Sequence, residues 1–78
     1  MNLAVHFGAA VRRHRALLRL NQEELAERAG IDRTYISGVE RNVRNPTLEV
    51  MQRISQALGA DLDVIFSTAR EICTKRDD

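Results

Sequence analysis

Apolar side chains recur through the first twenty residues at the three- and four-residue spacing of an amphipathic helix. The positions on this stripe are Leu3, Phe7, Val11, His14 and Leu18. The spacing predicts a helix from about residue 3 to residue 19. His14 is the one polar member. We interpret it as a half-buried packing residue rather than a metal ligand, because no companion ligands stand at a suitable spacing.

Capping residues divide the next stretch into two short helices. Asn21, followed three residues later by a glutamate, has the pattern of a capping box at a helix start. Gly30 suits a helix end, where a left-handed backbone is free of Cβ strain. Asp32 is a second N-cap, and Asn42 can end the helix that it starts. We therefore expect two helices joined by a tight turn over residues 22–41.

The last third of the chain has similar residues at the predicted starts and ends of helices. Residues 43–46 are typical of a loop, Thr47 caps a fourth helix and Gly59 ends it. Asp61 caps a fifth helix, predicted over residues 62–73. Apolar residues of the fourth helix keep helical spacing, at Leu48, Met51, Ile54 and Leu58. No stretch has the alternation of a strand, so the expected fold class is all-α, a compact five-helix bundle.

Composition limits how such a bundle is stabilised. A chain of 78 residues makes one domain, over residues 1–78. Hydrophobic residues make up 44% of the chain, but the aromatic ones are only Phe7, Tyr35 and Phe66, so the core must be mostly aliphatic. The single cysteine excludes an intramolecular disulfide, and no Cys/His cluster predicts a metal site. Helix packing or oligomerisation must therefore supply the stability.

The distribution of charge is more informative than the net charge of +1. Residues 1–20 contain four arginines and no acid, whereas residues 61–78 carry both signs. A protein that binds phosphates needs a local basic face rather than a global excess, although ordinary solvated helix faces explain these charges equally well. No apolar run is long enough for a membrane span, and no signal peptide is visible. These features favour a cytoplasmic protein.

Residues 22–41 have the spacing of a helix-turn-helix motif. Ala26 is small enough for the second helix to approach, and Gly30 suits the turn. The apolar seam between the helices is predicted at Leu25, Ala29, Ile31, Ile36 and Val39. An ordinary helical hairpin is the alternative, but a hairpin does not need all of these positions to be filled at once.

The same residues resemble a known family. Phe7-Gly8, NQEELA at 21–26 and YISGVER at 35–41 are similar to the Cro/C1-type (Xre-like) helix-turn-helix family, over nearly the full chain. DRTYISGVERNVRNPT at 32–47 most resembles the controller proteins of restriction–modification systems. The resemblance implies a lambda-repressor-like DNA-binding domain. It also implies that this short chain acts by itself, as a homodimer, on the operator of its own operon.

The second helix of the motif would lie in the major groove, with its first turns against the base edges. Arg33 can donate two hydrogen bonds to guanine, Thr34 can bond a base edge or touch a thymine methyl, and Ser37 lies on the same face. Tyr35 is a further candidate for base or backbone contact, with packing against the neighbouring helix as the alternative. Gly38 costs roughly 1 kcal/mol in a helix interior, which close approach to DNA or to another helix would explain.

Contacts to the DNA backbone are predicted around the motif. Gln22 stands at a helix N-terminus, which favours phosphate, and the resemblance implies this use of a glutamine. The residues that follow the recognition helix would lie near a flanking strand; they are Arg41, Asn42, Arg44 and Asn45. For Arg44, entry into the minor groove is the alternative. Arg12 is a further phosphate candidate, whereas Arg13 and Arg19 are interpreted as solvated charges.

The resemblance also implies an ion pair between Arg15 and Glu40. Such a pair would tie the first helix to the end of the recognition helix, and Arg15 would then be structural. A direct contact between Arg15 and DNA is the alternative.

The fifth helix has more apolar residues than one face of a terminal helix can bury. This surplus predicts a dimerisation helix at about 61–73. The predicted interface residues are Leu62, Val64, Ile65, Phe66, Ala69 and Ile72. Burial of all six in the core of the monomer is the alternative.

Double-stranded operator DNA and a second copy of the chain are the expected partners, and RNA polymerase would be a third for an activator. Neither a cofactor nor a membrane is expected. A phage-type repressor and the antitoxin of a toxin–antitoxin pair are alternative functions, which the neighbouring gene would discriminate. An enzyme is not expected, because no acid/base pair, nucleophile dyad or phosphate loop can be assembled. The sequence gives His6 and Cys73 none of the companion residues that a metal site or a nucleophilic catalytic site would need.

Overall fold

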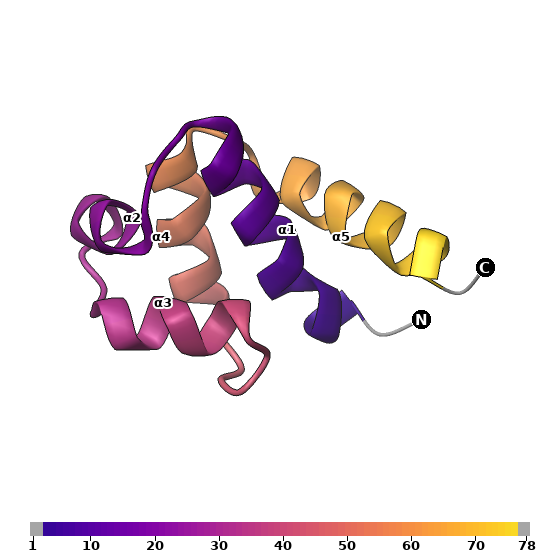
Figure 1. Ribbon diagram of the computed structural model, residues 1–78, viewed down its shortest axis with the longest axis horizontal. Helices are drawn as coiled ribbons and strands as arrows, with labels where there is room; N and C mark the ends of the chain where they lie inside the picture. The colour runs from indigo at the N-terminus through magenta and orange to yellow at the C-terminus, as the bar shows by residue number, and fades with distance from the viewer. Residues whose placement is uncertain (1–2, 77–78) are drawn as a thin grey trace.

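Capping residues start three of the helices. The computed structural model describes residues 3–76 and the side chains of residues 6–75. Backbone N–H groups donate hydrogen bonds to the side chains of the residues that precede three helices, Asn21, Asp32 and Thr47. The five helices are α1 (Leu3–Leu17), α2 (Gln22–Ala29), α3 (Arg33–Glu40), α4 (Leu48–Leu58) and α5 (Leu62–Arg76) (Figure 1). No residue from 3 to 76 is in a strand, and the predicted all-α fold is confirmed.

Two helix boundaries differ from the prediction. α1 ends at Leu17, because Arg19 adopts a left-handed backbone with φ of 57° and the Leu20 amide donates to a carbonyl oxygen in the last turn of the helix. Leu18 is therefore 47% exposed instead of lying on the buried stripe, and Leu20 is buried. At the other end of the chain, α5 continues beyond its predicted end to Arg76.

The core lies between α1 and the other four helices. Its largest fully buried side chains are Phe7, Val11, Leu25, Ile36, Ile54 and Ile65. Leu3, at the start of the predicted stripe, is outside the side chains that the structure describes. Gly8 allows α1 to approach α3 closely, since a Cβ there would collide with the Val39 carbonyl oxygen. Figure 1 shows the result, with α3 along one edge of the molecule beneath α1 and α4.

α1 also packs along α5. The Phe7 and Phe66 ring centres are 5.6 Å apart, and His14 Nε2 lies 2.9 Å from Thr68 Oγ1. His14 is half-buried, as predicted. Among the described residues, no helix is long and apolar enough to cross a membrane. That part of the chain also holds no group of three or more His, Cys, Asp or Glu side chains arranged to bind a metal.

Candidate nucleic-acid interface

α2 and α3 meet through a short turn. Gly30 has the left-handed backbone expected of it, with φ of 67°, and the Ile31 amide closes the turn by donating to the Ala26 carbonyl oxygen at 3.0 Å. Ile31 is half-buried, and the other side chains of the predicted seam are buried; they are Leu25, Ala29, Ile36 and Val39. Turn and seam together give the geometry of a helix-turn-helix.

The outer face of α3 is polar. Arg33 and Thr34 are exposed in its first turn, and Ser37, one turn later, is half-exposed. Asp32 caps this turn by accepting from the Thr34 amide at 2.7 Å. The same hydrogen bond lowers the pKa of the Asp32 carboxyl. Because the cap fixes the first turn, the side chains most suited to base edges stand on a defined surface.

Tyr35 contacts the loop that follows α3. Its hydroxyl donates to the Asn45 carbonyl oxygen at 3.4 Å, and Cζ of Arg44 lies 5.7 Å from the centre of its ring. The ring is half-buried and also packs against the core. The structure therefore shows the packing role that was given as the alternative. The Tyr35 ring packs against this loop and the core, and not only against the neighbouring helix. A contact of Tyr35 with a base or with the DNA backbone stays a prediction.

Gly38 makes room for the same loop. A Cβ at Gly38 would lie 2.5 Å from Cγ of Arg44. The Gly38 carbonyl oxygen accepts from the amides of Val43 (2.8 Å) and Arg44 (3.2 Å), so the chain turns back onto the helix. Asn42 permits the turn by adopting a left-handed backbone, with φ of 61°. The predicted approach of another helix was wrong, because side chains of this loop, Arg44 and Val43, lie next to Gly38. Close approach of Gly38 to DNA stays a prediction.

This loop carries most of the residues predicted to contact the DNA backbone. The exposed ones at the end of α3 and in the loop are Arg41, Asn42, Arg44 and Asn45. Figure 1 shows the loop at the same edge of the molecule as α3. The structure thus brings the predicted backbone residues beside the predicted reading face.

A charged cluster holds α1, α2 and α3 together. Arg15 donates to both carboxylate oxygens of Glu40, at 2.8 and 2.9 Å, and to the Leu20 carbonyl oxygen at 2.9 Å. The hydrogen bond to Glu40 raises the pKa of Arg15. Gln22 also donates to Glu40, at 3.0 Å, and no sequence pattern indicated this contact. Arg15 is therefore engaged within the fold, as the family resemblance implied.

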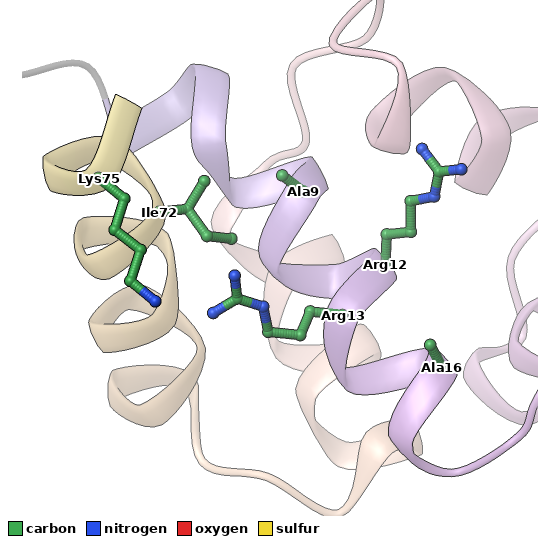
Figure 2. A pocket seen from close by; sticks show the side chains of 6 residues that line it. All are labelled: Ala9, Arg12, Arg13, Ala16, Ile72 and Lys75. Carbon is green, nitrogen blue, oxygen red and sulfur yellow. The ribbon is translucent and has the colours of Figure 1, made fainter. Parts of the chain in front are cut away.

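The two central arginines of α1 point in different directions. In Figure 2, Arg13 projects toward α5 over the groove between the two helices, and Lys75 projects toward it from α5. Arg12 points away from α5. Both arginines are exposed. Both arginines line this groove, but only the guanidinium of Arg13 extends toward α5.

Half of the predicted dimer interface is buried within the chain itself. Ile65 and Ala69 have no exposed surface, and Ile72 is 9% exposed. Their prediction as interface residues was wrong, because their spacing puts them on the face of α5 that packs into the core beside α1.

The apolar surface that remains lies on two sides of α5. Leu62 and Phe66 are half-buried, and Phe66 lines an open cavity together with Met51 of α4. Leu48, one helical turn before Met51, is 60% exposed. Val64 is 45% exposed, and helical geometry puts it on the side of α5 away from Phe66. Met51 is half-buried and packs against the core, so of these two residues only Leu48 is exposed.

Comparison with known proteins covers most of the chain. A helix-turn-helix family model matches residues 11–65. The control protein C.BamHI of Bacillus amyloliquefaciens is 42% identical over 59 residues, which are 74% of this chain and 73% of that protein. A helix-turn-helix transcriptional regulator of Mycobacterium tuberculosis is 34% identical over 62 residues, but the match spans only 44% of its length.

Solved structures include a similar fold. The restriction–modification controller protein C.Esp1396I matches with a TM-score of 0.87 and 32% identity, over 96% of this chain and 97% of that one. C.Esp1396I has also been solved as a tetramer in complex with its natural 35-base-pair operator. The match extends beyond α2 and α3 to nearly the whole chain.

Proposed function

Because the chain belongs to the Cro/C1-type helix-turn-helix family, we propose that it is a transcriptional regulator that binds a specific operator in double-stranded DNA. The observation that carries this proposal is the polar outer face of α3, which a cap and an apolar seam hold at the edge of the molecule. Arg33, Thr34 and Ser37 on this face read bases. The exposed loop after α3, together with Gln22 and Arg12, contacts the DNA backbone.

The regulator acts as a homodimer in this proposal. The surface that supports it lies beside α4 and α5, where Leu48, Met51, Leu62 and Phe66 are not fully covered by the chain itself. A two-fold dimer places two copies of α3 roughly 34 Å apart, one turn of DNA. Since the two copies are related by symmetry, the operator is pseudo-palindromic.

The regulated genes are those of a restriction–modification operon, including the regulator's own gene. The likeness to C.BamHI and to C.Esp1396I supports this assignment. A phage-type repressor or an antitoxin would use the same fold. A neighbouring methyltransferase or endonuclease gene favours the controller, an integrase gene favours the phage repressor, and a small toxin gene favours the antitoxin. An activator of this kind would also contact RNA polymerase.

Sedimentation and DNA binding test the proposal. At micromolar concentration the chain should sediment at twice its 8.8 kDa mass. It should also retard a duplex from just upstream of its gene at concentrations that leave random DNA free. Leu48→Glu should shift the sedimentation toward monomer without unfolding, because Leu48 is exposed. Val64 was also predicted as an interface residue, but it lies on the other side of α5 and is outside the interface proposed here. Val64→Glu is therefore the matched control and should stay dimeric.

Two results would count against the proposal. A chain that remains monomeric with and without DNA overturns the dimer. Equal affinity for upstream and random DNA, in a wild-type chain that is folded, overturns the specific operator.

Arg44→Ala should weaken binding to specific and random DNA by similar factors, because a phosphate contact carries no sequence information. Loss of this charge should also flatten the dependence of log K on log salt concentration by about one unit per half-site. Titrations at several salt concentrations measure the slope. Arg13→Ala, on the side of α1 that faces α5, should leave this slope unchanged. A slope that Arg44→Ala does not alter would remove Arg44 from the phosphate contacts.

A further inference from the structure

One carboxylate connects three helices beside the proposed DNA-binding surface. Glu40, the last residue of α3, accepts from Arg15 Nε at Oε2 (2.8 Å) and from Arg15 Nη2 at Oε1 (2.9 Å). Oε1 also accepts from Gln22 Nε2 at 3.0 Å. The side chain of Glu40 is only 3% exposed and that of Arg15 only 16%. The ion pair is therefore largely buried, and Gln22 beside it is half-buried.

The hydrogen bond to Glu40 decides which end of the Gln22 amide is held. Gln22 is the first residue of α2, at the helix end whose backbone N–H groups favour an anion. A glutamine amide offers an oxygen acceptor and a nitrogen with two N–H donors, and only a donor can bind phosphate. Because one N–H is directed inward to Glu40, the nitrogen end is fixed against the protein. The second N–H is left for a group outside.

The charge of the cluster matters as well. An uncompensated carboxylate this close to the α2 N-terminus would repel a phosphate. Arg15 binds both oxygens of Glu40 and so neutralises the charge locally. Gln22 can then be oriented by a strong acceptor whose charge is neutralised. Of the two acids in the first turn of α2, Glu23 and Glu24, the second is held in the capping box by the Asn21 amide.

We infer that Glu40 is a positioning residue for DNA binding, which holds the Gln22 amide for a backbone phosphate while Arg15 neutralises it. Neither Glu40 nor Arg15 touches DNA in this arrangement. The inference rests on the proposed DNA-binding function, and it assigns to the ion pair a role beyond stability.

A set of four proteins tests the inference: wild type, Gln22→Ala, the double variant Arg15→Met/Glu40→Met, and the triple variant. The double variant removes the acceptor of Gln22 without leaving a buried charge, and replacement of a buried ion pair by apolar residues is often tolerated. Thermal unfolding establishes that each protein is folded, and anisotropy titration with a random 30-base-pair duplex measures binding. Gln22→Ala should weaken binding about tenfold per bound subunit in the wild-type background. In the double-variant background it should weaken binding less than about twofold.

An equal effect of Gln22→Ala in both backgrounds would show that the ion pair is only structural and would overturn the inference. If the double variant does not fold, Glu40→Gln takes its place, because it exchanges one acceptor oxygen for a donor at nearly constant volume. Arg44→Ala is the matched control and should weaken binding equally in both backgrounds. A wild-type chain that does not bind the duplex at all would instead contradict the proposed function.

Discussion

Arg15→Met is expected to lower the free energy of unfolding by at most about 3–5 kcal/mol, the cost reached when a fully buried charge loses its partner. The Glu40 carboxylate would lose both hydrogen bonds from Arg15 and keep only the one from Gln22. Glu40 has little access to water, because its side chain is 3% exposed in the packed structure. Since a domain of this size has only about 5–15 kcal/mol of stability, the variant should be near the limit of folding.

Urea unfolding followed by circular dichroism measures this effect. Arg13→Met is the matched control: it makes the same substitution on the same helix at an exposed position, and should change stability by less than about 0.5 kcal/mol. The double variant Arg15→Met/Glu40→Met should recover most of the lost free energy of unfolding, because it buries no unpaired charge. If Arg15→Met is as stable as Arg13→Met, the pair does not stabilise the fold.

Local signals predicted most of the helix starts and stops. Asn21, Asp32 and Thr47 act on backbone groups two or three residues away, so their roles can be deduced from spacing alone. The end of α1 could not be deduced in this way. Arg19 adopts a left-handed backbone although it is neither glycine nor asparagine, and the apolar periodicity runs past Leu17, where the helix ends, to Leu18.

Contacts between distant segments were harder to predict. The spacing of α5 showed that apolar residues were in surplus, but the burial of Ile65 depends on where α1 lies. The neighbour of Gly38 is a loop residue, Arg44, whose position follows from the turn at Asn42. The bond between Gln22 and Glu40 joins the start of α2 to the end of α3, and only the packing of both helices brings those ends together. In physical terms, the sequence pattern predicts which residues are apolar or polar on each helix, but not which helix covers them.

Arg33→Ala is expected to weaken operator binding by roughly 1–3 kcal/mol per half-site, the discrimination of one bidentate contact to guanine. Arg33 is exposed in the first turn of α3, directly after the Asp32 cap, so its guanidinium extends from the surface proposed to enter the major groove. Loss of this contact should also relax the preference at one base position in each half-site. Arg33→Lys should not restore the preference, because an ammonium group lacks the planar fork of a guanidinium. Titration with the operator and with variants of that base measures both effects.

Folding should barely change in either Arg33 variant, which thermal unfolding can verify. A phosphate contact is the competing role for Arg33, with Thr34 and Ser37 left to read the bases. Selection from randomised DNA separates these roles, because a phosphate contact affects all sequences alike. If Arg33→Ala selects the wild-type consensus with every position equally sharp, Arg33 only positions the helix. If one position in each half-site becomes degenerate while the others keep their preference, the guanidinium reads that base. Arg44→Ala should leave the selected consensus unchanged, since its contact is proposed to be with the backbone.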